Sequence, residues 1–164
     1  MFYYLQRAKW EPTYDHSLAD LTLEQYAESG KAEENWVTRF LIHEYTNHLT
    51  EDHVTMAKEV MRRKVVVGLL DRFGDSLKRF ELYFDWWRAK IKPDAEEKMQ
   101  CQQERALASK NHLHHPDPPE SSAAFKKLAK LNWADMQLFQ YAIDLFEEQQ
   151  ALVSEKDASL TNDY

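Results

Sequence analysis

The residues from Thr50 to Trp87 show the most regular pattern of apolar and polar positions in this chain. Thr50 is a typical N-cap residue, and two acidic residues follow it, where the positive end of a helix favours negative charge. Apolar residues then recur at helical spacing, at Val54, Ala57, Val60 and Met61. The pattern therefore predicts a helix that begins after Thr50 and ends in the basic run from Arg62 to Lys64.

Three consecutive valines, Val65 to Val67, interrupt this helical pattern. β-Branched residues lose rotamer freedom in a helix and are common in strands, and Gly68 follows them directly. The segment from Val65 to Leu69 is therefore predicted to be a short buried strand. After a turn, Asp75 or Ser76 is expected to cap a second helix with a broad apolar surface. The apolar residues of that surface are Leu77, Phe80, Leu82, Phe84 and Trp87.

Further helices are predicted on both sides of this region. Thr22 and Gln25 have the spacing of a capping box before a short helix. The segment from Glu33 to Leu41 places apolar residues on one side of a helix, and this side is predicted to belong to the core. Its apolar residues are Trp36, Val37, Phe40 and Leu41.

The last part of the chain with helical spacing runs from Phe125 to Gln150. A helical stretch begins at Phe125, and Asn132 is expected to cap the final long helix. One face of that helix is predicted to lie in the core, and Leu138, Tyr141 and Leu145 broaden it. This face consists of Met136, Phe139, Ala142, Ile143 and Phe146.

Two groups of histidines are candidates for metal ligands. His43 and His48 are five residues apart, which places them roughly 140° apart around a helix, so they do not form a zinc-binding helix. A second group lies in the polar insertion or loop at residues 93–122, without a cysteine or a placed carboxylate beside it, and consists of His112, His114 and His115. No metal site is therefore predicted.

Composition narrows the functional classes. A chain of 164 residues fits one domain, and 43% apolar residues are enough to form a core. A formal charge of −7 argues against general nucleic-acid binding, which depends on Lys and Arg contacts to phosphates. No apolar run is long enough to span a membrane, so the chain is expected to be soluble as written. Residues 151–164 are expected to form a disordered tail.

The string AKEVMRRKVVVGLLDRFGDSLKRFELYF resembles the C-terminal half of the P-loop sulfotransferases, especially the carbohydrate type. That family has a helix, a strand that ends in a Gly-Leu pair, and another helix in this region. Other segments match in the same order, namely FYYLQRAKWEPTYD, ENWVTRFL, NHLHHPDP and LNWADMQLFQYAIDLFEEQ. The resemblance implies that residues 1–150 are mainly α with one short β-strand, the C-terminal helical part of an α/β P-loop fold resembling nucleoside triphosphate hydrolases.

The resemblance also implies transfer of a sulfuryl group from 3′-phosphoadenosine 5′-phosphosulfate (PAPS) to a hydroxyl of a carbohydrate acceptor. The family's phosphate-binding loop and the Arg and Ser that hold the 3′-phosphate would precede Met1, so no catalytic residue is assigned and the chain is expected to be inactive by itself. A full-length form would reside in the Golgi lumen. Residues at the place of the family's cofactor-covering loop are the cofactor-binding candidates, namely Ser109, Lys110, Asn111 and His112.

Basic residues near two tryptophans are the candidate site for the carbohydrate acceptor. Sugar rings pack against aromatic faces, and cations bind acidic or sulfated groups. The candidates are Arg62, Arg63, Trp86, Trp87 and Arg88, with Lys78 and Arg79 expected nearby. The alternative is a solvated helix end.

A second functional hypothesis is a non-catalytic helical protein-interaction module. A strand from Val65 to Leu69 without neighbouring strands would expose backbone groups, and a protein partner is expected to cover them.

Overall fold

The structure of the chain, a computed structural model, describes residues 9–10, 14–84, 97, 100–101, 104 and 118–151. Its first helices are α2 (His16–Ala19), α3 (Leu23–Glu28), α4 (Trp36–Ile42) and α5 (Glu51–Lys64). They are followed by the 3-10 helix η1 (Leu70–Arg72), α6 (Phe73–Phe84), α8 (Ala123–Leu131) and α9 (Trp133–Glu148). The fold is mainly helical, as predicted, and the described residues contain no strand.

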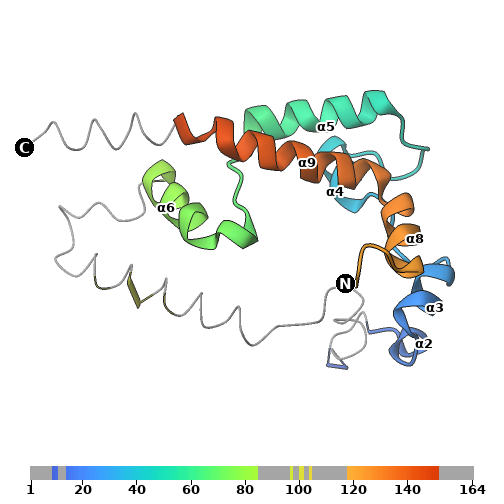
Figure 1. Cartoon of the computed structure of the whole chain (residues 1–164). Coiled ribbons are helices and arrows are strands. Elements are labelled where there is room, and N and C mark those ends of the chain that lie inside the picture. Colours follow the sequence, from blue (N-terminus) through green and yellow to red (C-terminus); the bar gives the residue numbers. More distant parts are fainter. Residues whose placement is uncertain are drawn as a thin grey trace, which may run out of the picture.

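The main core lies where α5 packs against α9, and Figure 1 shows these helices side by side with α4 next to them. Its buried residues come from α5, from the segment after α5, and from α9. They are Ala57, Met61, Val67, Leu138, Leu145 and Phe146. Full burial of a side chain such as Leu138 contributes roughly 2 kcal/mol, so this contact is the main source of stability between α5 and α9.

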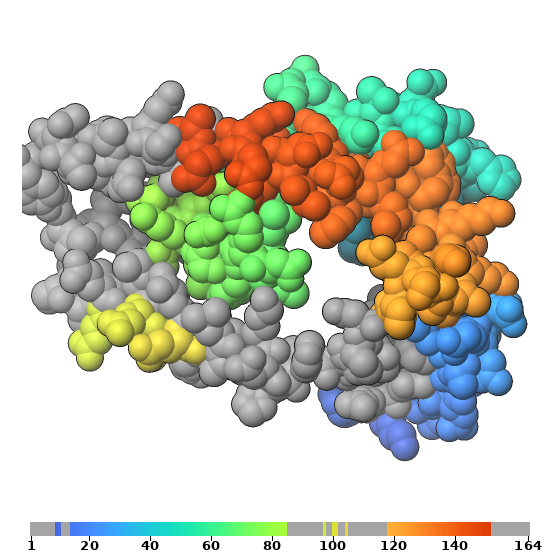
Figure 2. Space-filling view, in the orientation of Figure 1, coloured from blue at the N-terminus to red at the C-terminus, as the bar shows by residue number. Residues whose placement is uncertain are grey.

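A second contact joins α3 to α8 near the start of α9, on the side away from α6 (Figure 1 and Figure 2). Tyr26 and Ala27 of α3 and Ala124 of α8 are buried there. Thr22 Oγ1 accepts a hydrogen bond from the Gln25 N–H at 3.2 Å, and Gln25 Oε1 accepts one from the Thr22 N–H at 2.8 Å. The predicted capping box is therefore confirmed.

Helices α4 and α9 begin with a reciprocal pair of caps. Asn35 Oδ1 accepts a hydrogen bond from the Ala134 N–H at 2.8 Å, at the start of α9. The Asp135 carboxylate accepts hydrogen bonds from the N–H groups of Val37 and Thr38 at 3.0 and 2.8 Å, at the start of α4. The first N–H groups of a helix have no acceptor within their own helix. Here a side chain at the start of each helix accepts hydrogen bonds from these groups of the other helix.

Asn132 stands at the N-cap position of α9, but its side chain does not cap that helix as predicted. Its Nδ2 donates to the Leu128 carbonyl at 2.9 Å, and its Oδ1 accepts from the Asn35 N–H at 2.8 Å. The capping role passes to Asn35, whose φ of 52° lies in the left-handed region that Asn tolerates better than most residues. Thr50 precedes α5 as its N-cap, as predicted.

The predicted core faces of α4 and α9 are partly wrong. Trp36 and Phe40 are 52% and 50% exposed, whereas Thr38 is buried because both its N–H and its hydroxyl bond to Asp135. On α9, Phe139 is 58% exposed and Met136 is also exposed, while the buried residues are Ala134, Leu138, Leu145 and Phe146. Both helices carry apolar residues on more than one side, so periodicity alone did not identify the buried side.

Helix α6 begins at Phe73 and not at a cap formed by Asp75 or Ser76. The Ser76 side chain is buried and bonds to the segment before the helix, so it does not cap the helix. Leu77, Phe80 and Leu82 of the predicted apolar surface are half-buried and Phe84 is exposed, while Trp87 lies outside the described residues. Where the structure describes the chain, none of the helices combines the length and apolar character that a membrane crossing requires.

Candidate functional site

The segment from Val65 to Leu69 links α5 to η1 and has the extended conformation of a strand. Val65 has φ −120° and ψ 129°, and Leu69 has φ −106° and ψ 130°. The described residues contain no strand, so the predicted β-strand is an extended segment instead, and it lacks a neighbouring strand as predicted. The backbone N–H and C=O groups of the segment therefore need hydrogen-bond partners other than a neighbouring strand.

A glutamine side chain replaces a neighbouring strand on one edge of the segment. Gln149, directly after α9, is buried, and its Oε1 accepts from the Val67 N–H at 2.9 Å. Its Nε2 donates to the Val65 carbonyl at 2.7 Å. A primary amide carries a donor and an acceptor, as a backbone peptide group does, and so it satisfies two groups on the same edge.

Two side chains of α6 continue this edge toward Leu69. Ser76 Oγ accepts from the Leu69 N–H at 2.8 Å and lies 3.0 Å from the Leu69 carbonyl oxygen. Arg79 NH1 donates to the Val67 carbonyl at 3.4 Å. Val65, Val67 and Leu69 are thus all held from the side of α6 and α9, which we call the inner edge.

Val66 and Gly68 lie on the opposite edge, here called the outer edge. In an extended chain, consecutive residues direct their N–H and C=O groups to opposite sides. Val66 and Gly68 have no hydrogen-bond partner for these groups in the part of the chain that the structure describes. Gly68 is exposed and Val66 is half-buried.

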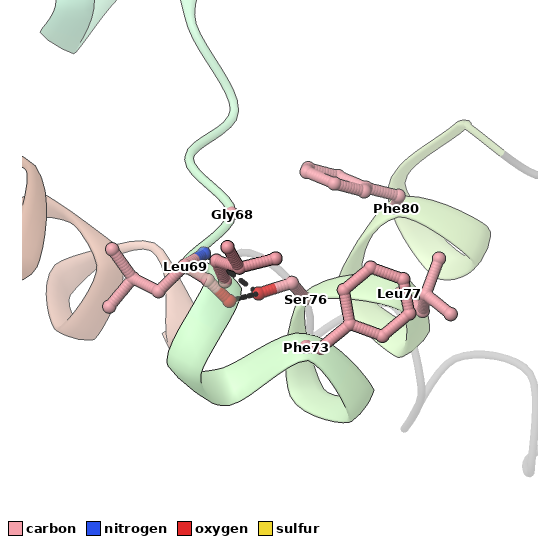
Figure 3. Close-up of a pocket in the computed structure, with 7 residues that line it drawn as sticks. Gly68, Leu69, Phe73, Ser76, Leu77 and Phe80 are labelled. Atoms are coloured by element: carbon pink, nitrogen blue, oxygen red, sulfur yellow. Dashed lines mark hydrogen bonds between the residues drawn. The ribbon is translucent and has the colours of Figure 1, made fainter. Parts of the chain in front are cut away.

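An apolar pocket of about 220 Å³ lies between the segment and α6, and Gly68 is part of its lining. Figure 3 shows Phe73, Leu77 and Phe80 on the α6 side, and Gly68 on the segment. The complete lining is Gly68, Leu69, Leu70, Phe73, Ser76, Leu77 and Phe80. A Cβ atom at Gly68 would lie 2.5 Å from the Phe80 ring, so only glycine allows Phe80 its place against the backbone.

Arg79 is the most unusual buried group near the segment. It is only 2% exposed, contrary to its expected place in a surface basic patch. Its Cζ lies 3.6 Å from the Phe146 ring centroid, and its NH2 donates to Gln150 Oε1 at 3.1 Å. Its Nε has no hydrogen-bond partner among the described residues. Burial lowers the pKa of Arg79, and the nearby Arg72 cation lowers it further, yet guanidinium stays protonated in proteins.

Of the predicted acceptor-binding residues, the structure describes only Arg62 and Arg63. Arg62 binds Glu59 through Nε and NH2 at 2.9 and 2.8 Å, and Arg63 Nε also donates to this carboxylate. Hydrogen bonds from Arg62, and then from Arg63, lower the pKa of Glu59 to about 2. The two arginines therefore lie together at the exposed end of α5, with one carboxylate between them that offsets part of their charge.

The other predicted site residues fall outside the described residues. These are Trp86, Trp87 and Arg88 of the acceptor site and Ser109, Lys110, Asn111 and His112 of the cofactor site. In the described ranges, no three side chains of His, Cys, Asp or Glu come together as metal ligands. In comparisons with protein-family models, with curated proteins and with solved structures, nothing matches this chain.

The residues that hold the inner edge were not found from the sequence. Gln149 is 82 residues from Val67, so no local pattern connects them. The sequence gives a weak indication that Ser76 and Arg79 contact the segment. They are polar and three residues apart, so they share a helix face, and each directly precedes an apolar position, Leu77 or Phe80.

Proposed function

We propose that this chain is a non-catalytic helical protein-interaction module that binds an extended segment of a partner protein. The observation that carries this proposal is the division of the Val65–Leu69 backbone between two edges. The inner edge is bonded to Gln149, Ser76 and Arg79, while Val66 and Gly68 present their backbone groups on the outer edge. An exposed edge of this kind is what an added strand pairs with.

The inner-edge bonds favour such binding because they fix the segment in an extended conformation before a partner arrives. Ordering a flexible segment costs about 1–2 kcal/mol per residue, and a segment that is already ordered avoids that cost on binding. The apolar pocket beside Gly68 adds a place for a side chain of the partner strand. Backbone bonds would then contribute affinity and the pocket would contribute selectivity.

The experiment that tests this proposal selects binders from a displayed library of short random peptides on the immobilised full chain. We expect extended peptides with an apolar side chain to be selected and to shift the backbone amide resonances of Val66 and Gly68. Val66→Pro should abolish their binding, because proline lacks the N–H on the outer edge. Val65 already has the extended conformation that a residue before proline requires, so the fold should persist.

Val66→Ile is the matched control, because it keeps the backbone N–H and the β-branched side chain. It should bind the selected peptides as the unchanged protein does. Peptides that bind the Val66→Pro variant equally well would show that the outer edge is not the binding site and would overturn the proposal.

A sulfotransferase-like role is the second proposal, and the order of α5, the extended segment and α6 favours it. In this case the chain would contribute to transfer of a sulfuryl group from PAPS to a carbohydrate hydroxyl, with Ser109 to His112 near the cofactor. The outer edge would then pair with strands from sequence beyond this chain. Calorimetry with adenosine 3′,5′-bisphosphate tests it, and an absence of binding at millimolar ligand would exclude independent cofactor binding.

A further inference from the structure

The backbone groups of the Val65–Leu69 segment have a symmetric order, because Val66 and Gly68 lie on the outer edge on either side of Val67. We propose that the edge pairs with the same edge of a second copy of this chain, in an antiparallel dimer whose two-fold axis passes beside Val67. The inference rests on the proposed function, since it names the partner that the outer edge binds.

The positions of the outward backbone groups support this pairing. Val66 and Gly68 flank Val67, so the order of outward, inward and outward residues reads the same in both directions. In an antiparallel pair centred on Val67, Val66 of each copy faces Gly68 of the other as a hydrogen-bonded pair. Each such pair exchanges both its N–H···O=C bonds, and every outward group of these residues is satisfied.

The side chains in this register are also complementary. Gly68 has no side chain, and the Phe80 ring lies against its backbone at the rim of the apolar pocket. Val66 of the second copy would stand opposite Gly68, next to this ring. Pairs of an aromatic and a β-branched side chain across neighbouring strands are favourable, and an aromatic ring laid over a strand glycine shields its backbone.

Charge at the two ends of the segment favours the antiparallel direction. Lys64 precedes the segment and Asp71 follows it, and both are exposed. Neither has an ion-pair partner within the described residues. Antiparallel pairing about Val67 brings Lys64 of one copy toward Asp71 of the other, at both ends of the interface. A parallel arrangement would instead place like charges together.

Two-fold symmetry makes this contact closed, because each copy uses the same patch and no edge is left for a third copy. A contact formed by one short strand pair and its flanking side chains is small, so we expect a weak dimer that depends on protein concentration.

Sedimentation velocity of the full chain over a range of concentrations tests the proposal. We expect a concentration-dependent shift from monomer to dimer. Val66→Pro should remain monomeric throughout, while Val66→Ile should dimerise as the unchanged protein does. Circular dichroism of each variant checks that the helices are retained.

Reversing the charges of Lys64 and Asp71 tests the dimer without a proline substitution. Lys64→Glu and Asp71→Lys should each weaken dimerisation by about tenfold, because symmetry repeats the pair and an exposed ion pair contributes up to roughly fivefold. The double variant should recover most of the lost association. Single variants that dimerise like the unchanged protein would overturn the proposed register.

A protein that stays monomeric up to its solubility limit would overturn the second-copy inference. If displayed peptides nevertheless bind Val66 and Gly68, the interaction module itself would stand with a different partner. A dimer that forms equally well with Val66→Pro would show that another surface holds the copies together, and would also overturn the inference.

Discussion

The Cζ atom of Arg79 lies 3.6 Å from the centroid of the Phe146 ring, and both side chains are buried. A cation over an aromatic face gains up to about 2 kcal/mol when water is excluded, which offsets part of the cost of burying the charge. Hydrogen bonds to the Val67 carbonyl and to Gln150 offset more of it. Arg79 therefore connects α6, α9 and the extended segment in one contact.

Replacing Arg79 separates its packing from its charge. Arg79→Ala removes the aliphatic stem, the ring contact and the bond to Val67, so we expect a loss of about 2–4 kcal/mol in the free energy of unfolding. Arg79→Met keeps most of the buried volume and removes the Nε that lacks a partner, so its loss should be smaller by about 1–2 kcal/mol. Urea denaturation followed by circular dichroism measures both. Equal stability of the Ala variant and the unchanged protein would contradict the buried position of Arg79.

Gln149→Leu tests whether a side-chain amide replaces a strand. Leucine has a similar size, but it leaves the Val67 N–H and the Val65 carbonyl without partners on the inner edge. Each unsatisfied buried group costs about 1–3 kcal/mol, so we expect a total loss of roughly 2–4 kcal/mol. The matched control is Gln140→Leu on the exposed side of α9, which should change stability by less than about 0.5 kcal/mol.

Hydrogen exchange adds a second measurement for Gln149→Leu. The Val67 amide should lose much of its protection in this variant, while the amides in the middle of α5 should keep theirs. Unchanged protection at Val67 would mean that this amide is satisfied in another way, whatever the stability of the variant.

The reciprocal caps can be tested with three substitutions. Asp135→Ala removes the acceptor for the Val37 and Thr38 N–H groups and should cost about 1–2 kcal/mol. Asn35→Gly removes only the capping side chain and tolerates the left-handed φ, whereas Asn35→Ala also strains the backbone. The Ala variant should therefore be less stable than the Gly variant by about 1 kcal/mol, as read from thermal or urea unfolding. The reverse order would show that the left-handed conformation is not maintained.

Glu59 should modulate any binding of acidic glycans by the exposed end of α5. A variant with Arg62, Arg63 and Arg88 changed to Ala should elute from heparin at lower salt than the unchanged chain, because it has fewer cations to bind sulfate groups and salt screens those that remain. Glu59→Gln should elute later, because it frees Arg62 and Arg63 from their shared carboxylate. Identical elution of all three proteins at low salt would remove this patch from the carbohydrate proposal.

Local signals in the sequence were sufficient for the approximate positions of α3, α4, α5 and α9 and for the backbone of the extended segment, but not for the caps of α6 and α9. The capping box at Thr22, the N-cap at Thr50 and the triple valine each act within a few residues, and each prediction of local conformation was confirmed. The partner of this segment could not be predicted locally, because the groups that bond Val65 and Val67 come from Gln149, more than 80 residues away.

The buried sides of α4 and α9 depended on contacts that the sequence does not display. Thr38 is buried because Asp135 binds it from a helix 97 residues further on, and this turns Trp36 and Phe40 outward. For the candidate site, an unpaired strand was predicted. The burial of Arg79 was not predicted, because its spacing from Ser76 is only a weak signal and its basic neighbour Lys78 is exposed.

The exchange of caps between Asn35 and Asp135 has a consequence for how the protein unfolds. The side chain of each residue accepts hydrogen bonds from the first N–H groups of the other helix. If the start of α4 unfolds, the N–H groups at the start of α9 therefore lose Asn35 as their acceptor. Two helix ends that are nearly 100 residues apart in the chain are thereby joined into one cooperative unit, and they should open together. The residues between Asn35 and Asp135 thus form a loop whose two ends are held together by hydrogen bonds instead of a covalent bond.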